Sequence, residues 1–153
     1  MRLIVLGEKT LDINNEELQN LAKHSLASLQ PKLVMSDFSI GWGIIAAHEA
    51  WKLAIPLMAV LPYEEVFGGE KYREIRNLTM KSTTSKVVFN KDYQSFLVNP
   101  KSYFKWVLSY ADAALCYVDV TRPSLAKQVM STLEATGRPV YNHFLGGEAH
   151  RNG

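Results

Sequence analysis

Residues 36–56 read SDFSIGWGIIAAHEAWKLAIP and join a serine-led turn with two glycines to an apolar segment that stops at a proline. Residues 43–53 are apolar on most sides, which predicts a largely buried helix. Glycine lets a backbone pass close to a neighbouring group. We therefore interpret Ser39, Gly41 and Gly43 as part of a loop that approaches a ligand.

Short aliphatic runs flank this stretch and predict buried parallel strands. Residues 2–6 (RLIVL) end at a glycine, and residues 57–62 (LMAVLP) form a continuous apolar run of the kind that parallel strands show. Residues 14–29 carry apolar groups at the helical period, with Asn14 and Glu17 as a capping pair. Further strands are predicted at 32–35, 86–89, 113–118 and 139–141, and further helices at 70–81, within 92–109 and at 123–135.

This alternation predicts an α/β protein with a Rossmann-like, doubly wound, mostly parallel sheet and helices on both faces. We assign residues 1–145 to a single domain and residues 146–153 to a flexible C-terminal tail. Ligands of such sheets bind where strands end and helices begin. That rule selects the loops at 7–10, 36–43, 62–69 and 119–124.

Composition and charge narrow the class of protein. The 153 residues include 17 basic and 15 acidic side chains, a formal net charge of +2, so charge gives no support to a nucleic-acid partner, although that partner remains an open alternative. The single Cys116 lies in an apolar run and is interpreted as a buried hydrophobe. No apolar run approaches the ~20 residues of a membrane span, and the N-terminal run is too short for a signal peptide. We expect a cytoplasmic protein with no membrane partner.

The opening stretch resembles S-G-L-A-x-G-I-D-x-x-A-H-x-x-A of DNA-processing protein A, with matches at Ser36, Gly41, Ala47, His48 and Ala50. More broadly, the chain is similar to the SLOG superfamily, Rossmann-like domains that include that protein and the LOG phosphoribohydrolases. Small stand-alone bacterial and phage members show further motifs in the same order. Their counterparts here are Leu6-Gly7-Glu8-Lys9, Leu61-Pro62-Tyr63, Tyr110-Ala111-Asp112 and Gly137-Arg138-Pro139-Val140.

Several departures from the family pattern affect what the resemblance implies about catalysis. The family aspartate falls on Gly43, the polar R-N pair falls on Tyr103 and Phe104, and a Gly-Gly-Thr turn is replaced by TRPS at residues 121–124. The LOG-type signature P-G-G-x-G-T-x-x-E, with its catalytic glutamate, is absent from that loop. The resemblance therefore implies ligand binding rather than phosphoribohydrolase activity.

Side chains in the selected loops are suited to a nucleotide. A helix that begins near Pro123 offers free N–H groups to an anion, and the planar fork of Arg122 matches phosphate. The alternative is that Thr121 caps this helix and Arg122 is solvated. Trp42 and Tyr63 could each stack on a base or pack beneath a neighbouring loop. The predicted ligand-binding residues are Gly7, Lys9, Ser39, Gly41, Trp42, Gly43, Pro62, Tyr63, Thr121, Arg122 and Ser124.

We predict capture, for sensing or sequestration, of a nucleotide or nucleotide-derived small molecule at the C-terminal edge of the sheet. One alternative is a nucleotide N-glycosidase or phosphoribohydrolase-type hydrolase, with Glu8, Glu64 and Glu65 as weak catalytic candidates. Another is a single-stranded DNA-binding module. No cofactor is evident, and the histidines show no metal-ligand spacing. The aromatic segment 93–106 is a candidate homo-oligomer interface.

Overall fold

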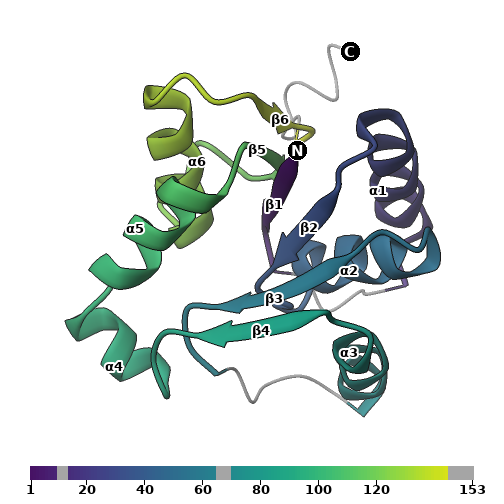
Figure 1. Ribbon diagram of the computed structural model, residues 1–153, viewed down its shortest axis with the longest axis horizontal. Coiled ribbons are helices and arrows are strands. Elements are labelled where there is room, and N and C mark those ends of the chain that lie inside the picture. Colours follow the sequence, from purple (N-terminus) through teal and green to yellow (C-terminus); the bar gives the residue numbers. More distant parts are fainter. Residues whose placement is uncertain (10–13, 65–69, 145–153) are drawn as a thin grey trace.

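The fold is a six-stranded parallel sheet between two layers of helices (Figure 1). The computed structural model describes residues 1–9, 14–64 and 70–144. Its strands are β1 (Arg2–Gly7), β2 (Leu33–Ser36), β3 (Leu57–Leu61), β4 (Ser85–Val88), β5 (Ala113–Tyr117) and β6 (Val140–Asn142). Its helices are α1 (Glu16–Leu29), α2 (Trp42–Lys52), α3 (Glu70–Lys81), α4 (Tyr93–Val98), α5 (Lys101–Tyr110) and α6 (Leu125–Ala135).

The strand order β4-β3-β2-β1-β5-β6 explains where a ligand site can form. The chain moves outward from β1 to β4 and then returns, so that β5 pairs with the free side of β1, and every pairing is parallel. The connections therefore diverge between β1 and β5, the topological switch point at which doubly wound sheets bind ligands. The prediction of a doubly wound parallel sheet is confirmed.

Each face of the sheet has its own apolar core because successive strand residues point to opposite sides. Leu3 and Val5 of β1 pack with buried residues of α1, α2 and α3. Ile4 and Leu6 pack with buried residues of α4, α5 and α6. The α2 helix, apolar on most of its sides, is almost wholly buried, as its sequence predicts. Two covered faces leave the strand ends as the place where a cavity can open.

Two helices begin at residues other than those predicted. Asn15, rather than Asn14, caps α1, and its side chain accepts a hydrogen bond from the Leu18 backbone N–H at 3.1 Å. Ser124 caps α6 in the same way, which places the first helical residue at Leu125 instead of near Pro123. In both cases an adjacent polar residue supplied a second possible cap, and the sequence alone did not separate the two registers.

Replacing Ser124 with alanine should lower the free energy of unfolding by about 1 kcal/mol, the usual cost of losing such a cap. The Ser124 hydroxyl oxygen accepts a hydrogen bond from the Lys127 backbone N–H at 3.0 Å, and alanine leaves that donor to water. Urea unfolding followed by circular dichroism measures the change. Ser131→Ala, at an exposed position of the same helix, is the matched control and should shift stability by less than about 0.5 kcal/mol. Equal stabilities for the two variants would contradict the cap.

Cys116 lies fully buried in the core beneath α6, as its apolar surroundings in the sequence predict. Burial raises the pKa of its thiol to about 12, and the charge of Glu134 adds to the rise. We expect a thiol-specific reagent to leave the folded chain unlabelled and to label it fully in urea, because the thiolate is the reactive form. Since the folded pKa exceeds the unfolded one, stability from the neutral thiol is complete below about pH 8.5 and is lost as the pH rises toward 12. Rapid labelling of the native protein would contradict this burial.

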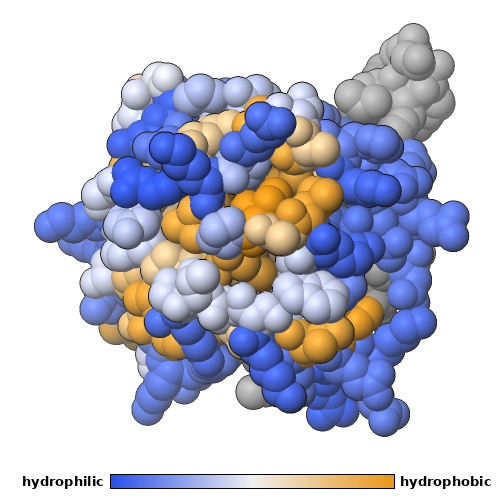
Figure 2. All heavy atoms as spheres, turned by 45° about the vertical axis from the view of Figure 1, so that its right-hand side comes forward, coloured by the Kyte–Doolittle hydropathy of each residue, from blue (hydrophilic) through white to orange (hydrophobic). Residues whose placement is uncertain are grey.

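The aromatic segment 93–106 divides between core and surface. Phe96 and Tyr103 are buried, whereas Tyr93, Leu97 and Val98 of α4 are exposed. Figure 2 shows that apolar residues also gather in a hollow on one face of the molecule, rimmed by hydrophilic residues. An oligomer interface in this segment stays a prediction.

Among the described residues, no helix combines the length and the apolar character that crossing a membrane requires.

Candidate ligand-binding site

A cavity of about 790 Å³ opens at the switch point between β1 and β5. Its volume falls in the range of roughly 300–1,000 Å³ that is usual for small-molecule sites. All four of the loops selected from the sequence contribute to its lining, those after β1, β2 and β3 and the one that leads from β5 into α6. Helices α4 and α5 close one side. The 18 residues around it are Leu6, Gly7, Glu8, Lys9, Asp37, Ser39, Pro62, Tyr63, Tyr93, Phe96, Leu97, Tyr103, Arg122, Pro123, Ser124, Leu125, Ala126 and Gln128.

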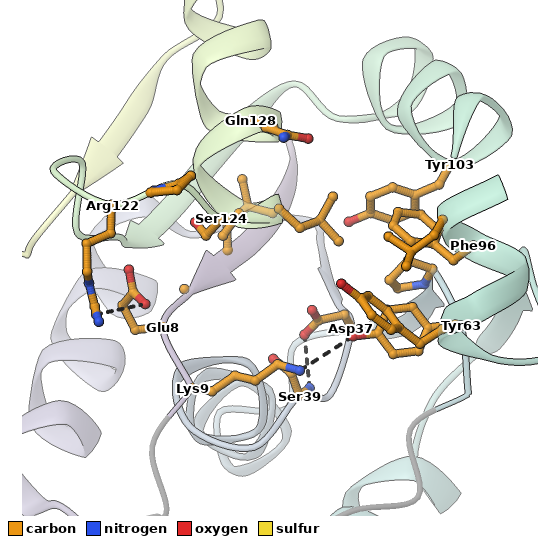
Figure 3. A pocket seen from close by; sticks show the side chains of 18 residues that line it. Glu8, Lys9, Asp37, Ser39, Tyr63, Phe96, Tyr103, Arg122, Ser124 and Gln128 are labelled. Atoms are coloured by element: carbon orange, nitrogen blue, oxygen red, sulfur yellow. Dashed lines mark hydrogen bonds and ion pairs between the residues drawn. The ribbon is translucent and has the colours of Figure 1, made fainter. Parts of the chain in front are cut away.

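One wall of the cavity is a cluster of aromatic rings (Figure 3). Tyr63 follows β3, and its ring centroid lies 5.1 Å from that of Tyr93 and 5.6 Å from that of Phe96. The ring of Phe96 meets Tyr103 of α5 edge-on at 5.9 Å. Tilted and edge-to-face contacts of this kind hold each ring in place. The result is a firm apolar surface that a flat heteroaromatic ring can contact.

Tyr103 carries a polar group into this apolar wall. Its side chain is buried, with 2% of the residue exposed, and its hydroxyl points into the cavity (Figure 3). Burial raises the pKa of Tyr103 well above its usual value, and the nearby charges of Asp37 and Tyr63 add to the rise. The phenol is therefore a hydrogen-bond donor throughout the physiological pH range.

The opposite side of the cavity is formed by the start of α6 and by charged residues of two loops. The Arg122 guanidinium lies 3.1 Å from Asp119 Oδ2 and 3.6 Å from Glu8 Oε2. Glu8 Oε1 also accepts a hydrogen bond from the Asp119 backbone N–H at 2.7 Å, which ties the β1 loop to the β5 loop. Hydrogen bonds from Thr121 hold the pKa of Asp119 below its usual value, with a smaller contribution from Arg122. Arg122 thus sits between two carboxylates.

A third edge of the cavity is formed by Lys9 and by the loop after β2. Lys9 Nζ lies 3.5 Å from the Tyr63 hydroxyl and 6.0 Å from the centre of that ring. The backbone of Lys9 pairs with that of Gly41 in an isolated antiparallel bridge. On the same side, Asp37 Oδ1 accepts a hydrogen bond from the Ser39 backbone N–H at 2.9 Å, which fixes the carboxylate at the cavity (Figure 3).

The structure brings most of the predicted ligand-binding residues to this cavity. Those that line it are Gly7, Lys9, Ser39, Pro62, Tyr63, Arg122 and Ser124. Thr121 lies outside the lining, and its hydroxyl donates to Asp119 Oδ1 at 2.6 Å. Thr121 does not cap α6, because Ser124 is the cap. Arg122 is exposed to solvent, as the alternative has it, with 69% of its side chain accessible, and it is ion-paired as well.

Trp42 does not face the cavity, which corrects the expectation that it stacks on a base. Its side chain is fully buried, and its indole N–H donates to the Leu115 carbonyl at 3.3 Å. Gly7 permits this packing, because a Cβ built there would come within 2.6 Å of Trp42 Cγ. Gly7 therefore lines the cavity and also lets the end of β1 pack closely against Trp42.

Gly41 and Gly43 are also explained by internal packing rather than by a ligand. Gly41 has φ of 108°, a conformation that side chains disfavour, and immediately precedes α2. A Cβ on Gly43 would lie 2.6 Å from Asp37 Oδ1 and 2.7 Å from Ser39 Oγ. Both glycines are buried and neither lines the cavity. They let the loop fold tightly enough to hold Asp37 at the rim.

The three carboxylates considered for hydrolysis have different positions. Glu8 lines the cavity, where it contacts Arg122 and the Asp119 backbone. Glu64 does not line the cavity and pairs instead with Arg76 at 3.7 Å and Lys86 at 3.1 Å. Glu65 lies outside the described residues. Among the described residues, no group of histidine, cysteine, aspartate and glutamate side chains could hold a metal ion.

Sequence reasoning did not select Asp37, Tyr103 or the α4 residues of the cavity. Asp37 follows β2 within a loop that had been selected, so its position at a strand end was an available signal. Tyr103 carried one signal, its place at the polar R-N pair of the family pattern, whereas Phe96 carried none, because it lies on a helix whose path after β4 is not encoded in a local motif.

Comparison with known proteins supports the fold at low sequence identity. No protein-family model matches the chain, and no curated protein matches it. Among solved structures, DNA processing protein A from Streptococcus pneumoniae is similar with a TM-score of 0.62 and 12% identity, over 99% of this chain and 55% of that one. The protein TM1055 gives a TM-score of 0.57 and 17% identity, over 91% of this chain and 71% of that one.

DNA processing protein A from Helicobacter pylori, solved to describe its single-stranded DNA binding mode, is similar with a TM-score of 0.56 and 15% identity. The match covers 92% of this chain and 63% of that one. The chain thus spans 55% and 63% of the two DNA-processing proteins. These likenesses show that the chain shares the fold of these proteins, which agrees with the Rossmann-like fold that its sequence predicts.

Proposed function

We propose that the chain binds a nucleotide-derived small molecule in the cavity between β1 and β5. The observation that carries the proposal is the wall of Tyr63, Tyr93, Phe96 and Tyr103, which faces a polar rim across a space of ligand size. Pockets that combine an apolar surface with a few converging polar groups are typical small-molecule sites. This cavity lies at the topological switch point, where nucleotide ligands bind in doubly wound folds.

The two sides of the cavity suit the two parts of such a ligand. The base would lie against Tyr63, whose ring the neighbouring aromatic side chains hold in place. The sugar and any further polar group would face Ser124 and Arg122 on the opposite side, with Lys9 beside Tyr63 (Figure 3). Binding of this kind supports sensing or sequestration, because it requires no reacting group.

Tyr63→Ala should weaken ligand binding by about 1–3 kcal/mol, the range found when a base loses an aromatic partner. The test is native mass spectrometry of the purified chain with a mixed pool of nucleosides, nucleoside monophosphates, NAD and ADP-ribose. We expect the wild-type chain to retain an intact ligand that Tyr63→Ala loses. Tyr141→Ala, at an exposed tyrosine of β6, is the control and should retain it. A chain that retains nothing from the pool would contradict the proposal.

The hydrolase alternative rests on Glu8, a carboxylate in the cavity. It would be favoured if the same experiment released a free base or a sugar phosphate and Glu8→Gln abolished the release. The single-stranded DNA alternative rests on the fold shared with the Helicobacter pylori protein. It would be favoured by oligonucleotide binding that weakens steeply with added salt, because released counterions dominate such binding.

A further inference from the structure

We propose that the ligand of this cavity is a neutral nucleoside rather than a phosphorylated nucleotide, and that Tyr103 and Asp37 bind the edge of its base. This inference rests on the proposed function and specifies the ligand class. It comes from two observations at opposite sides of the cavity. One is that Arg122 is already paired with carboxylates. The other is that the hydroxyl of Tyr103, a buried residue, points into the cavity.

The arginine of the cavity is already paired with carboxylates, although its side chain is 69% exposed, so water screens these pairs. Arg122 is shared by Glu8 and Asp119, at 3.6 and 3.1 Å. A phosphate that took over Arg122 would bring a charge of about −1.5 to −2 beside both carboxylates and leave them without their cation. Asp37 adds a third carboxylate at the rim. Repulsion between like charges therefore opposes a phosphate here.

The start of α6 offsets only part of this repulsion. A helix N-terminus attracts anions through its free N–H groups. At α6, however, the Lys127 backbone N–H is already bonded to the Ser124 hydroxyl at 3.0 Å. Lys9 is the other cation of the lining, and its ammonium group lies against the ring and hydroxyl of Tyr63. These polar groups of the cavity therefore suit a sugar. Its hydroxyl groups can donate hydrogen bonds to the Glu8 carboxylate and accept one from the Lys9 ammonium group.

The aromatic wall provides the polar groups for a base. Tyr103 is nine-tenths buried or more, and its hydroxyl points into the cavity (Figure 3). Within the described part of the chain, no hydrogen bond joins this hydroxyl to another residue. The hydroxyl faces the cavity and is not among the buried atoms left without a partner, so an acceptor on the ligand can take the place of water there.

Asp37 supplies the complementary acceptor. Its carboxylate lines the cavity, and one oxygen is held by the Ser39 backbone N–H at 2.9 Å. A carboxylate can accept several hydrogen bonds, so it can take a base N–H in addition. Asp37 and Tyr103 both line the same cavity, from the loop after β2 and from α5 (Figure 3). Together they match a base edge that carries a donor next to an acceptor.

The experiment is calorimetric titration of the full chain with adenosine, guanosine, cytidine and uridine, each beside its monophosphate. We expect one nucleoside to bind about tenfold or more tightly than its monophosphate, since charge repulsion opposes the phosphate. Tyr103→Phe should weaken that nucleoside about fivefold by removing one neutral hydrogen bond. Asp37→Asn should weaken it about tenfold, because a charged acceptor is lost while the bond to Ser39 can persist.

Tyr110→Phe is the matched control, because Tyr110 is an exposed tyrosine on the same helix as Tyr103. Its nucleoside affinity should equal that of the wild-type chain, and circular dichroism establishes that all variants are folded. Tighter binding of every monophosphate than of its nucleoside would overturn this inference and leave the proposed function standing. Unchanged nucleoside affinity in both Tyr103→Phe and Asp37→Asn would overturn the role of this pair. Failure of the whole panel to bind would overturn this inference, whereas the proposed function fails only if the mixed pool with NAD and ADP-ribose also leaves no ligand on the chain.

Discussion

Trp42→Ala is expected to lower the free energy of unfolding by about 3–5 kcal/mol, the usual cost of truncating a buried aromatic side chain. The indole is fully buried, its N–H donates to the Leu115 carbonyl at 3.3 Å, and its ring lies 5.6 Å from that of Tyr117. Alanine leaves a cavity under the β1–β5 end of the sheet. Since single domains are stable by only about 5–15 kcal/mol, much of the population could unfold. Urea unfolding at equilibrium measures the loss.

Trp106→Ala is the control for this prediction. Trp106 is only partly buried and stacks on the exposed Tyr110, with ring centroids 4.6 Å apart. Its loss should cost clearly less than that of Trp42, because less apolar surface leaves the core. If Trp42→Ala kept nearly native stability and lost only ligand affinity, the indole would be a ligand contact, and its placement in the core would be wrong.

Gly7→Ala should destabilise the protein by about 1–3 kcal/mol through overpacking. A Cβ at this position would come within 2.6 Å of Trp42 Cγ, so the indole or the end of β1 must shift. The test is a double-mutant cycle with Trp42→Leu, measured by urea unfolding. The smaller leucine should leave room for the new methyl group, so Gly7→Ala should cost much less in that background.

Gly137→Ala is the matched control for Gly7→Ala. A Cβ on Gly137 would meet no atom within 4 Å, although its φ of 78° makes the alanine strained. The cost of Gly137→Ala should therefore be the same with Trp42 or Leu at position 42. Equal costs of Gly7→Ala in the two backgrounds would contradict a steric role for Gly7.

The strands and the parallel, doubly wound class of the sheet could be predicted from the sequence, because parallel strands and buried helices have strong local patterns. The run at 57–62 is continuous and apolar, and it forms β3, a strand buried between β2 and β4. The apolar segment after Gly41 forms α2 for the same reason. Cap positions were less certain, because Asn14 and Asn15 are chemically alike and only the backbone decides which one bonds to Leu18.

The loops of the site were also predictable, whereas the roles of individual residues were not. The switch-point rule placed Gly7, Tyr63 and Arg122 at one edge, and all three line one cavity. The same rule could not tell on which side of its loop Trp42 lies. A glycine motif signals a close approach, but the approach can be to another side chain, as with Gly7 and Trp42. The wall from α4 and α5 depends on how the chain crosses from β4 to β5.

The central claim is that the cavity between β1 and β5 is the ligand site. Its most direct test is a nuclear magnetic resonance titration of the isotope-labelled chain with adenosine, guanosine, cytidine and uridine and, in parallel, with their monophosphates. We predict that one of them shifts the backbone amide signals of Glu8, Lys9, Ala126 and Gln128, which line the cavity from the loop after β1 and from α6. Tyr63→Ala should reduce these shifts at the same ligand concentration. Shifts confined to residues away from this cavity would contradict the claim.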